Sequence, residues 1–322
     1  MSPVLALSTL SVVLALAGAS TGGSAQPAAP ASAAPVFTAE QLLADVKTLA
    51  GPEMEGRRTA TPGNAKARQL IVEQFRTLAL EPLGNDFQLP FTFERKGQGA
   101  TEGTTISGVN VAGVCRGTGA KDSGMMVVSA HYDHLGVRDG AVFHGADDNA
   151  SGVAALLAMA RQCRQSPWTH DALFVAFDAE ELGLQGARAF VASPPVPRER
   201  IAININLDMV ARGDKKELYV AGTHHTPALK AVLAPVSAAA PIKISFGHDS
   251  GGGQNDWTTQ SDHGAFHAAK IPFVYFGVED HPDYHKATDT ADKIDGAFFY
   301  QSALAIFNAI GAIDRALPLS SQ

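Results

Sequence analysis

The chain has 322 residues, of which 45% are hydrophobic, and it carries a formal net charge of −7 at pH 7. A chain of this length and hydrophobic content can bury a substantial core, in one large domain or in two smaller ones. The charge is modest and no segment is rich in lysine or arginine, so nucleic-acid binding has no support in the sequence.

The N-terminal 35 residues have no charged side chain, because the first charged residue of the chain is Glu40. The apolar run VLALSTLSVVLALAGAS has the length of a signal-peptide core and is short for a membrane span. The stretch TGGSAQPAAPASAAP that follows has the composition of a flexible linker. We therefore predict a signal peptide and linker over residues 1–35, one folded domain over residues 36–322, a secreted or periplasmic location, and no stable membrane anchor.

From residue 36 onward, segments with helical spacing of apolar residues alternate with short apolar strands. The pattern predicts helices over 38–50, 63–80, 150–163, 184–193, 226–239 and 296–313. It predicts strands over 86–95, 107–117, 124–130, 172–177, 201–207, 217–222, 242–246 and 271–278. Wholly apolar strands separated by helices are typical of the α/β class, here a single domain with a mostly parallel central sheet and helices on both faces.

The two cysteines, Cys115 and Cys163, match no metal-binding spacing. They fit either one disulfide in an oxidising compartment or two buried thiols. We favour the disulfide because the N-terminal segment indicates export.

Histidines, aspartates and glutamates follow the predicted strands at the point where each strand ends. They form the segments HYDH (131–134), DAEE (178–181), LDM (207–209) and EDHPDYHKATDT (279–290), and HGADDNASG (144–152) begins the helix at 150. Ligands of open α/β sheets bind at the carboxyl ends of the strands. Imidazole and carboxylate donors without a thiolate suit zinc, and two metal ions can share one carboxylate. The sequence therefore predicts a divalent-metal site.

Six segments together carry a family resemblance: SAHYDHLG, GADDNASG, DAEELGLQGA, NLDM, SDHGAF and YHKATDT. The sequence resembles the co-catalytic di-zinc aminopeptidase family, which also contains glutamate carboxypeptidases and glutaminyl cyclases. It is most similar to the secreted bacterial leucyl-type aminopeptidases, over nearly all of residues 36–322. The resemblance implies a zinc-exopeptidase fold of the phosphorylase/hydrolase-like type, two Zn²⁺ per chain, and hydrolysis of peptides with a free N-terminus. We also expect a monomer.

The resemblance assigns five metal ligands, which are His131, Asp148, Glu181, Asp208 and His285. His131 and Asp208 would hold one zinc, Glu181 and His285 the other, and Asp148 would bridge both. The family's bridging carboxylate stands three residues before a serine, which selects Asp148 rather than Asp147. The peptide bond after it is typically cis in the family.

Three further residues receive catalytic roles from the same resemblance. Glu180 would be the general base, because Glu181 is taken as a ligand and an uncoordinated carboxylate must accept the proton of the attacking water. Asp133 would hold the second ring nitrogen of His131. The hydroxyl of Tyr284 would help to stabilise an oxyanion.

The sequence does not settle the roles of the other polar residues near these motifs. His134 and His144 are read as supporting or surface residues rather than ligands. Asp262 recurs near the substrate in the family, but N-capping of a helix by Ser261 explains that stretch nearly as well. Residues 248–256 either line a specificity pocket or form a plain loop, and the segment GRR (56–58) receives no role.

Three other functions are alternatives to a secreted zinc aminopeptidase. A carboxypeptidase needs a cationic pocket, and no arginine or lysine clusters near the site motifs. A glutaminyl cyclase binds one zinc and typically has Trp-His where this chain has Tyr284 and His285. A non-enzymatic, receptor-like relative would have lost ligands, whereas all five are present here.

Overall fold

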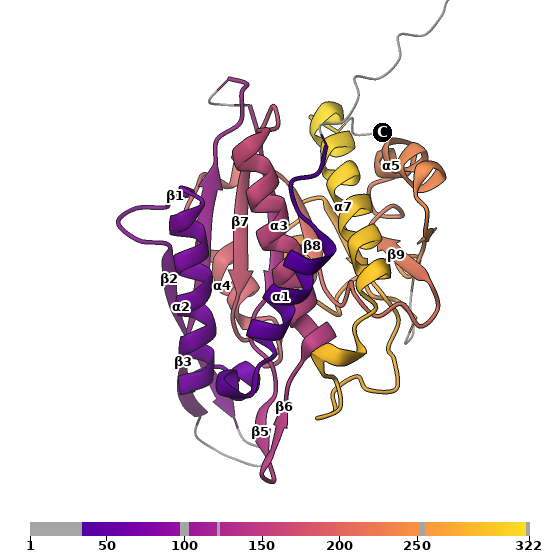
Figure 1. The fold of residues 1–322 in the computed structure, drawn as a ribbon. Coiled ribbons are helices and arrows are strands. Elements are labelled where there is room, and N and C mark those ends of the chain that lie inside the picture. Colours follow the sequence, from indigo (N-terminus) through magenta and orange to yellow (C-terminus); the bar gives the residue numbers. More distant parts are fainter. Residues whose placement is uncertain (1–33, 97–102, 121–122, 252–254, 320–322) are drawn as a thin grey trace, which may run out of the picture. The chain divides into compact units, whose positions relative to one another are not determined.

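The central sheet is mixed and runs in the order β1-β3-β7-β4-β8-β11-β9-β10, with β2 also paired to β3 (Figure 1). In this computed structural model, which describes residues 34–96, 103–120, 123–251 and 255–319, the predicted signal peptide and most of the linker lie outside the described residues. The strands of the sheet are β1 (Glu81–Pro82), β2 (Gln88–Lys96), β3 (Gly103–Cys115), β4 (Met125–His131), β7 (Asp171–Phe177), β8 (Ile201–Leu207), β9 (Glu217–Ala221), β10 (Lys243–Phe246) and β11 (Phe273–Gly277). A separate hairpin pairs β5 (Gly136–Arg138) with β6 (Ala141–Phe143).

The centre of the sheet is parallel, as predicted. Strands β7, β4, β8 and β11 run in one direction, whereas β3 is antiparallel to β7 and β9 is antiparallel to β11. The four parallel strands therefore end at the same edge, and the segments that follow them are brought together there.

Helices cover both faces of the sheet. The larger apolar core packs under α1 (Ala39–Leu49), α2 (Pro62–Thr77), α3 (Gly152–Gln165), α5 (Ala228–Ala239) and α7 (Gly296–Ala316). The smaller core, on the other face, packs under α4 (Gln185–Ala192) and α6 (His263–Ala268). Successive side chains of β7 alternate between the two, with Phe174 in the first and Val175 in the second. The predicted α/β class with helices on both faces is confirmed.

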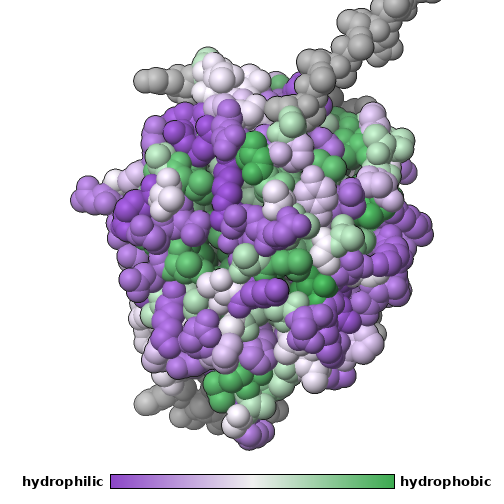
Figure 2. Space-filling view, viewed as in Figure 1, coloured by the Kyte–Doolittle hydropathy of each residue, from purple (hydrophilic) through white to green (hydrophobic). Residues whose placement is uncertain are grey.

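Among the described helices, α7 is long and apolar enough to cross a membrane by length and composition. It packs against α1, α3 and α5, and its residues Phe299, Ile306 and Ile310 are fully buried in the larger core. These contacts account for its hydrophobicity as that of a core helix. The face of the molecule shown in Figure 2 is mostly hydrophilic, with hydrophobic residues scattered among polar ones.

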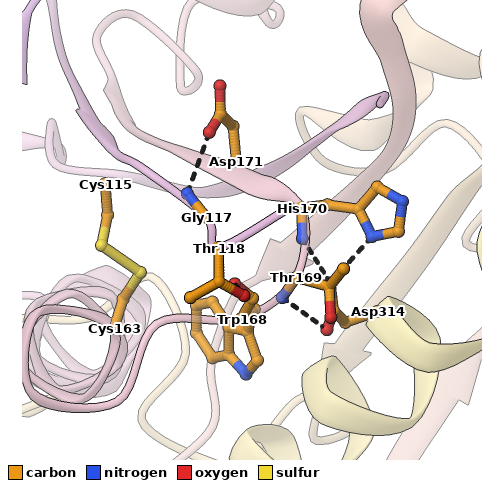
Figure 3. Close-up of a disulfide and its surroundings, with 9 residues drawn as sticks. All are labelled: Cys115, Gly117, Thr118, Cys163, Trp168, Thr169, His170, Asp171 and Asp314. Atoms are coloured by element: carbon orange, nitrogen blue, oxygen red, sulfur yellow. Dashed lines mark hydrogen bonds and ion pairs between the residues drawn. A yellow bond between two sulfur atoms is a disulfide. The ribbon is translucent and has the colours of Figure 1, made fainter. Parts of the chain in front are cut away.

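Cys115, at the end of β3, forms a disulfide with Cys163 of α3 (Figure 3). The favoured interpretation of the two cysteines is therefore confirmed. Beside the disulfide, the carboxylate of Asp314 on α7 accepts hydrogen bonds from the backbone N–H groups of Thr169 and His170 (Figure 3). The disulfide thus joins β3 to α3, and the bonds of Asp314 join α7 to the entry to β7.

Candidate metal centre

The five predicted metal ligands meet at the carboxyl edge of the parallel strands. Nε2 of His131, the last residue of β4, lies 3.3 Å from Oδ1 of Asp208 and 3.4 Å from Oδ1 of Asp148. On the other side of Asp148, Oδ2 lies 3.1 Å from Nε2 of His285, which is 3.4 Å from Oε2 of Glu181. The two oxygens of Asp148 thus face two separate imidazole–carboxylate groups.

The two groups differ in their access to solvent. The side chains of His131 and Asp208 are buried, at 1% and 10% exposed, whereas that of His285 is 40% exposed. The group around His285 therefore forms the open side of the centre, and a molecule from solution reaches it first.

The Asp148–Asn149 peptide bond is cis, as the resemblance implies. It lies in a short helical segment, η2 (Ala146–Ser151), whose start is held by Asp289. The carboxylate of Asp289 accepts hydrogen bonds from the backbone N–H groups of Asp147 and Asp148, and the side chain of Asp147 accepts one from the backbone of Ala211. Asp147 thus takes part in the hydrogen bonds beside the predicted ligand Asp148, and its Oδ2 also lies 3.3 Å from Nε2 of His281.

Asp133 supports both His131 and the loop that follows β7. The ring nitrogen Nδ1 of His131 lies 3.2 Å from the backbone oxygen of Asp133 and 3.7 Å from its Oδ1. The Asp133 carboxylate accepts hydrogen bonds from the backbone N–H groups of Glu180 and Glu181, at 3.0 and 3.3 Å. One buried carboxylate therefore orients a predicted ligand and fixes the backbone of both glutamates, a second task that the sequence did not indicate.

His134, interpreted from the sequence as a supporting or surface residue, lies directly beside two predicted ligands. Its Nδ1 is 2.7 Å from Oε1 of Glu181 and 3.7 Å from Oδ2 of Asp148, and these three residues are grouped tightly enough to hold a metal ion. Burial lowers the pKa of His134 to about 4, so the ring is neutral at physiological pH. His144, in contrast, bonds through Nδ1 to the backbone oxygen of Ala50.

Arg57, from the segment that received no role, is fully buried beside the centre. Its guanidinium donates hydrogen bonds to the backbone oxygens of Leu49, Tyr132, His144 and Gly145. Burial lowers its pKa to about 10, and the carboxylates around it oppose that shift, so it stays positively charged at neutral pH. Arg57 ties the segment that follows His131, at the end of β4, to the segment that leads into η2 and Asp148. In the sequence, this role of Arg57 was marked only by the adjacent pair Arg57 and Arg58, to which no role was assigned.

The donors fit a divalent cation by their chemistry and by their electrostatics. Burial raises the pKa of Glu181 to about 8, and the neighbouring Asp148 carboxylate acts in the same direction. Burial raises the pKa of Glu180 well above its ordinary value; the ring of His131 opposes this shift, and the carboxylate of Asp208 adds to it. Crowded, buried carboxylates interleaved with imidazoles are the oxygen and nitrogen donors that zinc prefers, and a cation among them would favour the ionised forms of the carboxylates.

Two further sequence interpretations concern Tyr284 and the segment around Asp262. The ring of Tyr284 stacks on that of His285 at a centroid distance of 3.9 Å, and burial raises the pKa of its hydroxyl, which therefore keeps its proton. Ser261 does not cap α6, because its hydroxyl accepts a hydrogen bond from Asn206 and makes no cap bond. Asp262 is fully buried, and neither of its carboxylate oxygens has a hydrogen-bond partner among the described residues.

The family model of peptidase family M28 matches residues 110–310, a range that contains all five predicted ligands and both adjacent glutamates. This chain belongs to peptidase family M28. Aminopeptidase YwaD of Bacillus subtilis is 32% identical over 203 residues, which are 59% of this chain and 41% of YwaD. Two other curated relatives are the probable lipoprotein aminopeptidase LpqL of Mycobacterium tuberculosis and the BOS complex subunit NCLN of Canis lupus familiaris. The chain spans about 40% of the length of each of these three relatives.

Solved structures share the fold. BSAP, a zinc aminopeptidase from Bacillus subtilis, aligns with a TM-score of 0.71 at 19% identity, over 86% of this chain and 95% of that chain. The glutaminyl cyclase from Fimbriiglobus ruber aligns with a TM-score of 0.69 at 21% identity, over 89% of this chain and 99% of that chain. The zinc-exopeptidase fold implied by the resemblance is confirmed.

Proposed function

We propose that this chain is a zinc-dependent aminopeptidase, which binds two zinc ions and hydrolyses the first peptide bond of peptides with a free N-terminus. The observation that carries the proposal is the position of Asp148, whose two oxygens face His131 on one side and His285 on the other. In this assignment His131 and Asp208 would hold one zinc, His285 and Glu181 would hold the other, and Asp148 would be shared by both. Bound zinc supplies a water of lowered pKa and polarises a carbonyl oxygen.

Glu180 is assigned as the general base. Its backbone is held by Asp133, and its side chain shares the electrostatic environment of His131 and Asp208 without occupying a place in either ligand group. The carboxylate would accept a proton from the attacking water and pass it to the departing amine.

Tyr284 is assigned to the developing oxyanion. Its ring lies on His285 at the open side of the centre, where a substrate carbonyl would arrive. Its hydroxyl stays protonated because burial and the Asp148 carboxylate raise its pKa, so it can donate a hydrogen bond to negative charge on the carbonyl oxygen.

The base assignment is tested with Glu180→Gln, which keeps the size of the side chain and removes its basicity. We expect hydrolysis of unblocked aminoacyl anilides to fall by about 10²- to 10⁴-fold, the usual contribution of a general base, while zinc content stays at two per chain. The matched control is Glu199→Gln in η3 (Arg198–Arg200), where the side chain is exposed to solvent. Full activity in Glu180→Gln would overturn the assignment, and hydrolysis of N-acetylated substrates would overturn the aminopeptidase proposal.

A glutaminyl cyclase is the second candidate, because the solved cyclase from Fimbriiglobus ruber shares the fold. Metal analysis separates the two, since one zinc per chain would favour the cyclase and two favour the peptidase. A peptide with N-terminal glutamine separates them again. The peptidase releases free glutamine, whereas a cyclase releases ammonia and leaves the peptide bond intact.

A carboxypeptidase is disfavoured by the pairing of the nearby cations. Arg212 and Lys215 do line a small pocket with His281, which the sequence did not indicate. Arg212 is ion-paired with Asp214 and Asp283, and Lys215 with Glu279, so their charge is already compensated. A substrate carboxylate would have to displace these partners.

Export of the chain is part of the proposal. The predicted signal peptide and the Cys115–Cys163 disulfide both suit an oxidising compartment outside the cytoplasm. We also propose that the enzyme acts as a monomer. Expression with and without residues 1–33, followed by fractionation and mass spectrometry of the mature N-terminus, tests the location.

A further inference from the structure

A pocket of about 460 Å³ opens beside the metal centre, lined by His248, Asn255, Trp257, Gln260, Glu279 and Asp280. Its volume lies within the range of about 300–1,000 Å³ that is usual for small-molecule sites, so a whole amino-acid side chain fits. It is built from the segments that follow β10 and β11 at the carboxyl edge of the sheet.

One set of contacts and one electrostatic influence place this pocket beside the metal centre. The ring of Trp257 packs against that of Tyr275 at 5.8 Å, and the Tyr275 hydroxyl donates a hydrogen bond to the backbone oxygen of Asp208. On the other side, burial raises the pKa of Asp280, the nearby ring of His285 lowers it, and the carboxylate of Asp148 raises it. Asp280 thus lies within electrostatic reach of two predicted ligands.

One wall of the pocket is aromatic and held in place. The rings of His248 and Trp257 are stacked at a centroid distance of 3.8 Å, and the backbone N–H of Trp257 donates to the backbone oxygen of His248. Tyr219 packs edge-on against both rings, at 4.7 and 5.5 Å. The wall therefore offers a preformed aromatic surface, which can bind an alkyl chain or a cation.

The opposite wall carries an uncompensated negative charge. Glu279 is paired with Lys215, and the ring of His248 lies 3.8 Å from its carboxylate. Asp280 is exposed and makes no hydrogen bond or ion pair with any described residue, and none of the six lining residues is a lysine or arginine. Asp280 also lines the small pocket of Arg212 and Lys215, but those two cations are paired with other carboxylates. The carboxylate of Asp280 is therefore left without a positively charged partner in this pocket.

An aminopeptidase has a single substrate residue on the amino side of the bond that it cuts, so the pocket next to the metal centre receives that side chain. An aliphatic side chain would cover Asp280 without giving its carboxylate a partner, which is unfavourable. A lysine or arginine side chain would lay its methylene groups on Trp257 and bring its cation to Asp280 and Glu279. We propose that this pocket selects peptides whose N-terminal residue is lysine or arginine, an inference that rests on the proposed aminopeptidase function.

The test compares lysyl and norleucyl p-nitroanilides, which have side chains of similar length with and without the terminal ammonium. We expect kcat/KM to be about 10- to 100-fold higher for the lysyl substrate, the range of one or two charge-assisted contacts. In Asp280→Asn the ratio of lysyl to norleucyl kcat/KM should fall towards one. The matched control is Asp292→Asn in η4 (Ala291–Lys293), an exposed aspartate that lies outside the pocket and should leave the ratio unchanged.

The outcomes separate this inference from the proposed function. If neither anilide is hydrolysed by the zinc-loaded enzyme, the aminopeptidase proposal fails. If norleucyl is hydrolysed as well as lysyl, only the specificity inference is overturned. An equal loss on both substrates in Asp280→Asn would also overturn it, because the carboxylate would then act on the α-ammonium group or on the metal centre rather than on the side chain.

Discussion

The substitution Arg57→Lys asks whether the fixed shape of a guanidinium, rather than a buried positive charge, holds the backbone of the metal centre. Arg57 donates four hydrogen bonds, at 2.7–2.9 Å, to the carbonyl oxygens of Leu49, Tyr132, His144 and Gly145. These carbonyls belong to three separate segments of the chain. A lysine keeps the charge but gathers its three donors on one nitrogen atom.

The magnitude follows from counting acceptors. An ammonium has three donors for the four carbonyl oxygens that Arg57 contacts, and its geometry reaches two segments better than three. The oxygen of Gly145 keeps the backbone N–H of Ala150 as a donor, so the loss falls on the oxygens of Leu49, Tyr132 and His144. A buried carbonyl without a partner costs about 1–3 kcal/mol, so one or two of them lower the free energy of unfolding by about 1–6 kcal/mol. Since domains are stable by about 5–15 kcal/mol, most of the variant should remain folded.

Urea titration of the zinc-loaded enzyme measures the loss, with Arg58→Lys as the matched control because the neighbouring Arg58 is exposed. Competition with a chelator measures zinc affinity in the same pair of variants. We expect a lower unfolding midpoint and weaker zinc binding for Arg57→Lys alone, because the segments that carry His131 and Asp148 lose their common tie. Equal midpoints and equal zinc affinities for the two variants would refute this reasoning.

Two further predictions concern stability. Reduction of the disulfide, which joins the only two cysteines of the chain across 48 residues, should lower the free energy of unfolding by about 4 kcal/mol, as urea titrations with and without reductant will measure. An unchanged midpoint after complete reduction would contradict it. The hydrogen bonds from Lys293 and Arg212 hold the pKa of Asp283 below its usual range, so its contribution is present above about pH 4 and is lost as pH falls through the lowered pKa. Asp283→Asn should therefore cost up to about 1 kcal/mol at pH 7 and nothing in strong acid, measured by thermal unfolding across pH, and a cost independent of pH would contradict the ion pairs.

Much of the fold could be predicted from the sequence because the buried strands are short and wholly apolar. The same pattern placed polar residues at strand ends, where the sheet brings His131, Asp208 and Glu181 together. Periodicity reports burial but not the direction of pairing, so the antiparallel contacts of β3 and β9 were not predicted.

The residues that the sequence missed act through contacts that spacing does not encode. Arg57 bonds only to backbone oxygens, which every residue carries, so no partner side chain marked it in the sequence. Asp289 lies within a recognised motif, yet its bonds are to backbone N–H groups more than 140 positions earlier in the chain. His134 reaches Glu181 only because the loop after β7 folds back over the end of β4.

The carboxylate of Asp133 holds the backbone of residues 180 and 181 and not their side chains. The course of that loop is therefore independent of which side chains it presents, so a change at Glu180 or Glu181 alters the chemistry without releasing the main chain. The side chains of Glu180 and Glu181 can therefore be exchanged while the backbone that carries them stays in place. A protein built in this way can lose or exchange its reaction over evolutionary time and still fold.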